Sequence, residues 1–407
     1  MRRRIALFAL ALSLLAGRAS AGTRMMTRQT DAYFSTVSML CLYVEDGAEA
    51  EFERAWAQVK ALLGEIERAV SVSEPESDIA RFNALACGEE IAISPLTARL
   101  LDVAFEAYES TGGLYDPTVY PLVDLWGFSP RFNRNAYAPQ MPYDRAYEDG
   151  RLPLPRAEDI DALLPLVGLD GIAMTRRDGQ AYLRKETPPV EIDGTRIQAQ
   201  LDLGGIAKGF ACDLVIAMLR ESGYAQGHFV CGGSSLAVMS RPTQDGLYEL
   251  TIGKPRAGVS AQTHYATFCA RDVGVSTSVD VSHSFELDGV TYCHVIDPRT
   301  GWPINMPGED GAQAGLAAAT LLGDSAALCD ALTTALLVMG PQEAPRYLAR
   351  AGEERAVLVA FRDGADALQV LCGAGIERFA LADEGYVPAP DADGTDGKAR
   401  AQSLFAP

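Results

Sequence analysis

Apolar and polar positions alternate along the chain in patterns that predict both strands and helices. Residues 36–44 form a mostly apolar run of the kind found in a buried strand, whereas residues 51–70 repeat apolar side chains at helical spacing. Ser94-Pro95 supplies the N-cap and first turn of a second helix, which Gly112-Gly113 ends. Further helices are predicted at 158–164, 325–339 and from Pro341, and strands at 171–175, 191–192, 247–252, 266–269, 356–361 and 367–371. The pattern favours a core built from both kinds of element, without internal repeats.

The two ends of the chain are unlike its middle. Residues 1–21 combine three arginines, an apolar run and the small-residue segment Ala19-Ser20-Ala21, a pattern typical of a cleaved export signal. The alternative is an uncleaved N-terminal anchor that keeps the protein at the membrane. No cysteine lies near the cleavage site, so no lipid anchor is evident. Residues 386–407 are rich in Asp, Gly, Pro and Ala, which predicts a disordered acidic tail, and residues 31–385 are expected to form the folded domain.

Composition narrows the classes of partner. Of the 407 residues, 48% are hydrophobic, which is enough for a substantial core. Removing residues 1–21 takes away four arginines and no acids, so the net charge falls from −19 to −23. Such a surface does not attract nucleic acid or anionic lipid, so a phosphate-bearing ligand needs local neutralisation. The eight cysteines include no C-x-x-C pair, which argues against a zinc site or a disulfide scaffold.

The stretch LDLGGIAKGF, residues 201–210, is predicted to form a short strand, a glycine turn and the start of a helix that ends near Gly223. Glycines allow the backbone to approach a ligand closely, and the first helical N–H groups favour an anion. Lys208 adds a positive charge at the same place. The simpler interpretation is a tight strand-to-helix connection without a ligand.

Residues 115–128 gather Asp, Thr, Pro and aromatic side chains within a short loop. Such a mixture suits a loop that orders a planar ligand between aromatic rings and polar anchors. The alternative is that Trp126 and Phe128 only fill the core.

Two later segments carry candidate catalytic chemistry. His294 lies three residues before Asp297 and close to Thr300, so it is a plausible acid or base at neutral pH. Asp330 and Thr334 are four residues apart on a predicted apolar helix, and therefore share one helix face. A buried carboxylate needs a compensating charge, and a carboxylate with a hydroxyl suits Mg²⁺. The alternative is that Asp330 caps another element.

Taken together, these stretches resemble the ApbE-like FAD:protein FMN transferase family, the flavin transferases. The resemblance runs from about Phe34 to Gly375 and rests on the segments SDIARFN, GGLYDPTVYPLVDLWGF, LDLGGIAKGFACD, HVIDPRTGWPI and DALTTALLVMG. The resemblance implies an α+β fold of the ApbE type, with mixed sheets and packed helices in two lobes. It also implies a Mg²⁺-dependent reaction outside the cytoplasm, in a periplasmic or extracytoplasmic location. FAD is the substrate, FMN passes to a Thr or Ser hydroxyl of an exported acceptor flavoprotein, and AMP leaves.

The resemblance also implies roles for single residues. The metal ligands would be the carbonyl of Ala207 and the side chains of Asp330 and Thr334, with His294 as the catalytic base that deprotonates the acceptor hydroxyl. The implied contacts to FAD are Phe34, Tyr115, Asp116, Pro117, Thr118, Trp126, Lys208 and Phe210, with Asp297 and Thr300 shaping the turn after His294.

Three positions depart from the family pattern. Ser73 stands where relatives carry an aromatic residue, Ser234 where Asp or Asn is usual, and Val279 where Gly is expected. These departures border the expected pocket and leave Asp330, Thr334 and His294 in place. Two other functions stay open, a Mg²⁺-dependent FAD pyrophosphatase and a non-catalytic FAD-binding protein. The second would predict the loss of those three residues.

Overall fold

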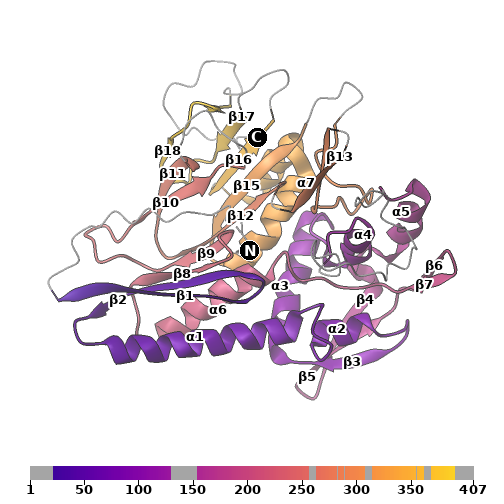
Figure 1. Cartoon of the computed structure of the whole chain (residues 1–407), viewed down its shortest axis with the longest axis horizontal. Helices are drawn as coiled ribbons and strands as arrows, with labels where there is room; N and C mark the ends of the chain where they lie inside the picture. The colour runs from indigo at the N-terminus through magenta and orange to yellow at the C-terminus, as the bar shows by residue number, and fades with distance from the viewer. Residues whose placement is uncertain are drawn as a thin grey trace, which may run out of the picture. The chain divides into compact units, whose positions relative to one another are not determined.

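Figure 1 shows the chain as a computed structural model, which describes residues 22–129, 154–255, 263–281, 283–287, 289–307, 314–353, 355–361 and 368–389. The predicted export signal lies outside the described residues. The fold divides into two compact units. Unit 1 takes its described residues from 1–64, 208–281 and 305–407, and unit 2 from 65–207 and 282–304. Among the described residues, no helix is both long and apolar enough to cross a membrane.

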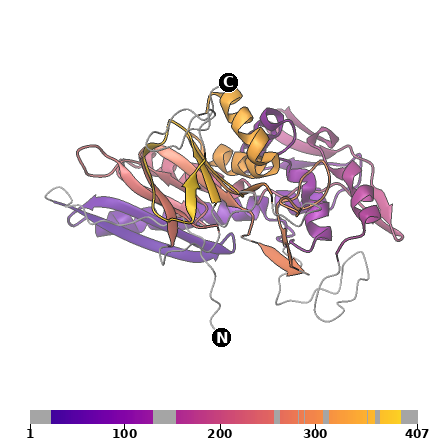
Figure 2. The same cartoon turned by 90° about the horizontal axis from the view of Figure 1, so that it is seen from above.

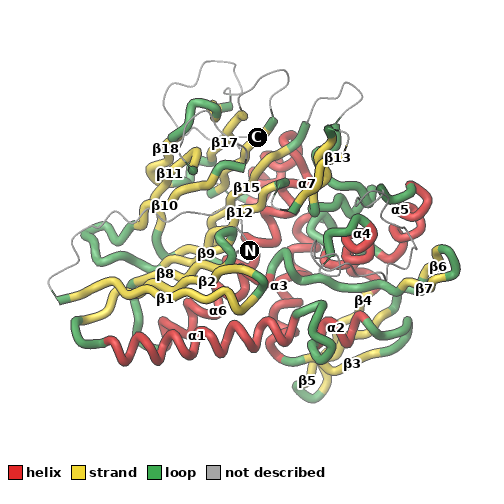
Figure 3. The backbone as a smooth tube through the Cα atoms, viewed as in Figure 1, coloured by secondary structure: helices red, strands yellow, loops and turns green. Residues whose placement is uncertain are grey.

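Within its described part, unit 1 is built on a nine-stranded mixed sheet, whose strands are yellow in Figure 3. Neighbouring strands are antiparallel except for the last pair, β17 and β19. The strands, in spatial order, are β1 (Thr23–Tyr33), β2 (Thr36–Glu45), β8 (Gly227–Cys231), β9 (Ser235–Val238), β12 (Val273–Val279), β15 (Leu316–Gly323), β16 (Ala356–Ala360), β17 (Leu368–Cys372) and β19 (Tyr386–Pro388). Strand β19 lies inside the segment predicted to be a disordered tail, so the predicted boundary at residue 386 is wrong. Its backbone pairs with β17, which holds these residues in the sheet.

A second sheet of unit 1 contains β10 (Tyr248–Gly253), β11 (His264–Ala270) and β18 (Glu377–Leu381). The apolar core of this unit joins residues of both sheets, including Leu250 and Phe268 from the smaller sheet and Val275 and Val357 from the larger one. Burial of these aliphatic and aromatic side chains is the main favourable contribution to the stability of the unit.

Helices α6 (Ala207–Glu221) and α7 (Ala326–Ala351) accompany the large sheet, and α7 packs along β12 and β15 (Figures 1 and 2). Gly340 interrupts α7 with non-helical backbone angles, as predicted for a second helix that begins at Pro341. The start of α7 lies very close to two glycines. A Cβ atom on Gly209 would lie 2.1 Å from the Ala326 carbonyl oxygen, and one on Gly274 would lie 2.5 Å from the Ala326 nitrogen.

Unit 2 combines helices with short sheets. Its helices are α2 (Asp78–Asn83), α3 (Pro95–Thr111), α4 (Tyr120–Leu125) and α5 (Ala157–Leu163), together with the 3-10 turns η1 (Pro117–Val119), η3 (Leu164–Leu166) and η4 (Leu169–Gly171). Its strands are β3 (Glu90–Ile93), β4 (Ile172–Arg177), β5 (Gln180–Lys185), β6 (Val190–Ile192), β7 (Thr195–Ile197), β13 (Ser284–Leu287) and β14 (Val290–Cys293). Helix α1 (Glu49–Val70) begins in unit 1 and ends in unit 2. The predicted caps of α3 are confirmed, with Ser94 accepting from the Thr97 amide and Gly112 in the left-handed conformation.

One predicted strand is wrong. Residues 201–203 form no strand with any described part of the chain. The Asn83 side chain takes the place of a neighbouring strand, because it accepts from the Leu201 amide at 2.7 Å and donates to the Leu201 carbonyl at 2.9 Å. The Asp202 amide donates to the Pro117 carbonyl. These contacts satisfy the backbone of the segment that precedes α6 without a strand.

Candidate active site

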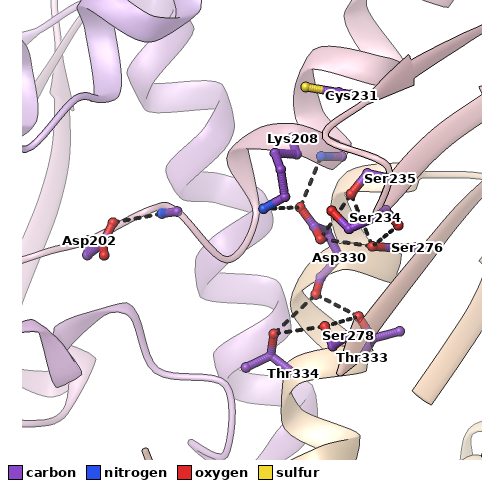
Figure 4. A network of polar contacts seen from close by, with 12 residues as sticks. Asp202, Lys208, Cys231, Ser234, Ser235, Ser276, Ser278, Asp330, Thr333 and Thr334 are labelled. Atoms are coloured by element: carbon purple, nitrogen blue, oxygen red, sulfur yellow. Dashed lines mark hydrogen bonds and ion pairs between the residues drawn. The ribbon is translucent and has the colours of Figure 1, made fainter. Parts of the chain in front are cut away.

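The Asp330 carboxylate in α7 is the centre of a buried polar network in unit 1 (Figure 4). Asp330 is only 4% exposed. Its Oδ1 accepts hydrogen bonds from the hydroxyls of Ser235, at 3.1 Å, and Ser276, at 2.8 Å. Its Oδ2 accepts the Gly209 amide of α6 at 3.0 Å and lies 3.9 Å from Lys208 Nζ. These donors and the ammonium compensate a charge that would otherwise be costly to bury.

Thr334 lies one turn after Asp330, so both side chains project from the same face of α7. The Thr334 hydroxyl lies 3.4 Å from the Ser278 hydroxyl and 3.5 Å from the Asp330 carbonyl oxygen. Ser278 also lies 2.9 Å from the Thr333 hydroxyl. Because Ser276 and Ser278 are two residues apart on β12, they present their hydroxyls on one face of the strand, toward α7.

The structure confirms one of the two interpretations of Asp330 that the sequence left open, and the metal interpretation stays a prediction. The Gly209 amide belongs to the first turn of α6, so Asp330 does cap another element. The carboxylate and the nearby hydroxyls are also hard oxygen donors. Within the described part of the chain, no group of three or more His, Cys, Asp or Glu residues could hold a metal ion. The donors fit Mg²⁺, which proteins often bind through one carboxylate while phosphate oxygens and water complete the shell.

The other predicted residues of this region come from the start of α6 and from the turn between β1 and β2. Ala207 opens α6 and ends the first segment of unit 2, residues 65–207, whereas Lys208 and Phe210 belong to unit 1. Phe210 is 4% exposed. Phe34 lies in unit 1 with Ser35 in the two-residue turn between β1 and β2, and both have positive φ, as a tight hairpin of this type requires.

The predicted loop residues at 115–118 are buried in unit 2. Asp116 precedes the turn η1 and its Oδ1 accepts from the Thr118 amide, at 2.8 Å, and the Thr118 hydroxyl, at 2.5 Å. Burial raises the pKa of Asp116 to about 6, and the two bonds from Thr118 oppose that rise. The Thr118 hydroxyl in turn accepts from the Gly168 amide at 2.6 Å. Tyr115 and Pro117 are buried beside them.

Trp126 fills the core of unit 2, as one of the two interpretations of this loop predicts. It is 2% exposed, and its indole N–H donates to the Gly301 carbonyl at 2.8 Å. The centre of its ring lies 5.7 Å from the ring centre of Tyr292 and 5.3 Å from that of Trp302. Phe128 packs in a similar way on Phe285. The structure therefore explains both aromatic side chains by packing.

His294 follows β14 in unit 2 and is partly buried. Its ring stands nearly perpendicular to that of His283, with 5.2 Å between the ring centres. The turn after it is closed by Asp297, whose carboxylate accepts the Arg299 amide and pairs with the Arg299 guanidinium at 2.7 Å. Thr300 is exposed, and its hydroxyl accepts from the Trp302 amide.

The structure thus groups the predicted residues in two sets. In unit 1, it brings Lys208, Asp330 and Thr334 together around one polar network. The second set, which consists of the residues at 115–118, Trp126 and the turn after His294, lies in unit 2. Sequence reasoning gave no role to Ser235, Ser276 and Ser278. The alternation of two serines on β12 was visible, but their contact with α7 depends on how the sheet packs.

Comparisons with known proteins identify the family to which this α+β chain belongs. The model of the ApbE family matches residues 34–359. A relative from Haemophilus influenzae, named FAD:protein FMN transferase, is 28% identical over 74% of this chain and 78% of its own length. A protein of the same name from Escherichia coli K12 is 28% identical over 72% of this chain and 74% of its own length.

Among solved structures, the apo form of a Pseudomonas stutzeri flavinyl transferase ApbE aligns with a TM-score of 0.65 and 25% identity. The alignment covers 88% of this chain and 95% of that one. The fold and the comparisons define an enzyme of the transferase class. The chain belongs to the ApbE family, since the family model spans most of its length.

Proposed function

We propose that this enzyme moves the FMN portion of FAD to a Thr or Ser hydroxyl of an exported acceptor flavoprotein, with Mg²⁺ as cofactor and AMP as the second product. The observation that carries the proposal is the Asp330 network. It places a buried carboxylate, a neighbouring hydroxyl and a lysine ammonium at the start of α6 in an otherwise strongly acidic chain. Relatives named FAD:protein FMN transferase support the choice of substrate.

We assign the metal ligands to the Asp330 carboxylate, the Thr334 hydroxyl and the Ala207 carbonyl. When bound, Mg²⁺ would supply charge neutralisation at the pyrophosphate and at the leaving phosphate of AMP. Lys208 would orient the phosphates through its ammonium group. In a chain of net charge −19, this local positive charge is needed to admit a dinucleotide.

The chemical step is a phosphoryl transfer. The acceptor hydroxyl oxygen attacks the phosphorus of the FMN phosphate, and His294 takes the hydroxyl proton as general base. The bond from this phosphorus to the bridging oxygen breaks, and AMP leaves with the electron pair of that bond. Asp297, by closing the turn with Arg299, would hold His294 in place. The resemblance to the family would also assign contacts to FAD to the residues at 115–118 in unit 2 and to Phe34 and Phe210 in unit 1, whereas core packing already accounts for Trp126.

We further propose that the protein works outside the cytoplasm after cleavage of residues 1–21. The basic start, the apolar run and the small-residue site support this location. The acceptor would then be a flavoprotein of the same compartment with an exposed Thr or Ser.

The test uses the mature chain, residues 22–407, with FAD, Mg²⁺ and an acceptor flavoprotein domain that carries one exposed threonine. We expect the intact mass of the acceptor to rise by one FMN phosphoester, and the rise to vanish with EDTA or when the acceptor threonine is changed to alanine. Free FMN and AMP without a mass gain would instead identify a pyrophosphatase. FAD bound but unchanged would identify a binding protein, and either result contradicts the proposal.

A further inference from the structure

Ser235 and Ser276 form a matched pair of buried hydroxyls that meets the same carboxylate oxygen. They are directly opposite each other in the register of β9 and β12. Their hydroxyls are 3.2 Å apart, and both side chains are fully buried. Each hydroxyl lies within hydrogen-bond distance of Asp330 Oδ1, at 3.1 Å from Ser235 and 2.8 Å from Ser276. Figure 4 shows both hydroxyls converging on Asp330.

The two oxygens of Asp330 therefore have different surroundings. Oδ1 receives two hydroxyl donors from the sheet, which occupy the two lone pairs that a carboxylate oxygen offers. Oδ2 receives one backbone amide from Gly209 and faces the Lys208 ammonium at 3.9 Å. A cation that approaches this carboxylate can bind Oδ2 without breaking a hydrogen bond, whereas binding at Oδ1 would displace a serine.

We propose that Ser235 and Ser276 are positioning residues that fix the Asp330 carboxylate and direct its Oδ2 toward the metal. The inference rests on the proposed function, because it assumes that Asp330 is a ligand of Mg²⁺. Outer-shell hydrogen bonds of this kind orient metal ligands, and their loss typically weakens metal affinity by about 10–100-fold. The serines need not touch FAD, the acceptor or the metal to have this effect.

The same strand offers a matched control. Thr277 lies between Ser276 and Ser278 on β12, so its side chain projects from the opposite face. Its hydroxyl lies 2.9 Å from the Thr320 hydroxyl on β15. Thr277→Val removes one strand hydroxyl at nearly constant volume, and it leaves the contacts of Asp330 unchanged.

The experiment measures Mn²⁺ binding, as a spectroscopic probe for the Mg²⁺ site, by the electron paramagnetic resonance of free Mn²⁺ in mature protein without acceptor. We expect Ser276→Ala and Ser235→Ala each to raise the Mn²⁺ dissociation constant by about tenfold or more. The Mn²⁺ dissociation constant of Thr277→Val should stay within about twofold of the wild-type value, since the Thr277 side chain contacts none of the proposed metal ligands. Ser276→Cys keeps a weaker donor in a similar volume, so its Mn²⁺ dissociation constant should lie between those of Ser276→Ala and the wild type.

A second measurement separates positioning from general damage. The Mg²⁺ concentration for half-maximal FMN transfer should rise by the same factor as the Mn²⁺ dissociation constant, and saturating Mg²⁺ should restore most of kcat. Serine variants that bind Mn²⁺ like the wild type, while Asp330→Asn does not bind it, would overturn this inference and leave the proposed function intact. Retention of Mn²⁺ binding by Asp330→Asn would instead overturn the metal assignment itself.

Discussion

Lys208 Nζ lies 3.9 Å from Asp330 Oδ2, on the side of the carboxylate that the serine hydroxyls leave open. The ammonium therefore neutralises Asp330 where a divalent cation would also bind. In a partly buried site this attraction is weakly screened, since the Lys208 side chain is 26% exposed and that of Asp330 is 5% exposed. Lysine and metal should compete for one oxygen.

Lys208→Met tests this competition, because it removes the ammonium and keeps most of the aliphatic stem. We expect Mn²⁺ to bind the FAD-free variant several-fold more tightly than the wild type, since the competing cation is gone. We also expect FAD to bind more weakly, measured by flavin fluorescence, because the phosphates lose a positive partner. Weaker Mn²⁺ binding in the FAD-free variant would show that Lys208 supports the metal instead of competing with it.

Asp330→Asn should abolish Mg²⁺-dependent transfer while the protein still folds. The amide keeps an oxygen for some of the donors that converge on this position, whereas Asp330→Ala leaves Gly209, Ser235 and Ser276 without their acceptor. A buried donor left without an acceptor costs about 1–3 kcal/mol, and because the Gly209 amide is left in this way the alanine variant should be less stable. Intact-mass transfer assays and urea unfolding of both variants separate the loss of function from the loss of stability. Full transfer by Asp330→Asn would refute the metal assignment.

Asp213→Ala is the contrasting change in the same unit. Asp213 accepts hydrogen bonds from the Ser325 hydroxyl at 2.8 Å, the Ala326 amide at 2.7 Å and the Ala327 amide at 3.0 Å, and so caps the start of α7. Loss of such a cap costs about 0.5–2 kcal/mol. We expect lower stability in urea unfolding, with the Mg²⁺ concentration for half-maximal transfer unchanged. A large change in that Mg²⁺ concentration would place Asp213 in the metal site.

His294→Ala should bind FAD with about wild-type affinity and lose transfer to the acceptor. The reason is that the proposed role of His294 is to take a proton from the acceptor hydroxyl, a contribution of about 10²–10⁴ in rate. The measurement compares FAD titration with intact acceptor mass over time. His283→Ala is a matched control, because that ring packs on His294 from an exposed position. Transfer that survives in His294→Ala at the wild-type rate would mean that another group is the base.

The buried side chain of His228 should make the stability of unit 1 decrease in acid. It is fully buried on β8, and neither ring nitrogen has a hydrogen-bond partner among the described residues. Burial, with a smaller effect of the Arg241 charge, lowers the pKa of His228 to about 3. Between about pH 6.5 and 3, the unfolded chain binds a proton that the folded chain does not, so stability falls as pH falls. The slope is at most about 1.4 kcal/mol per pH unit.

His228→Leu removes this proton linkage. Relative to the wild type, the variant should gain about 2–3 kcal/mol in the free energy of unfolding between pH 7 and pH 4, measured in urea. Asp116 acts in the opposite direction, because its pKa is raised to about 6, but it is present in both proteins and cancels in the difference. His264→Leu, a partly buried histidine on β11, is the control. A difference that does not change with pH would refute the linkage.

Local signals in the sequence were sufficient for much of the fold. The caps at Ser94 and Gly112 and the break at Gly340 depend on neighbouring residues only, and the structure confirms them. Strand β1 was not predicted. It is the edge strand of the large sheet and mostly exposed, so polar residues appear on both of its faces and no alternation develops. The prediction of a strand at 201–203 failed because the Asn83 side chain, and not a neighbouring strand, bonds to the backbone of Leu201.

In the candidate site, too, local sequence predicts some features, whereas others depend on residues that are distant in the chain. The common face of Asp330 and Thr334 follows from helical spacing alone, and the need to compensate a buried Asp330 follows from its apolar neighbours. The compensation by Ser235 and Ser276 does not follow from local sequence, because it requires the register of β9 and β12, which pairs these two serines across 41 residues of chain. Sequence pattern predicts which residues share an element, whereas long-range register decides which elements meet.

The two glycines at the start of α7 extend the site to residues without any functional atom. A side chain at Gly209 or Gly274 would collide with the Ala326 backbone, four residues before Asp330. Even a methyl group at either position would push the first turn of α7 away from α6 and β12, and the carboxylate would move with it. A mutational scan should therefore find these two positions among the least tolerant in the chain. Loss of transfer there would report displacement of a ligand, although no chemical group had been removed.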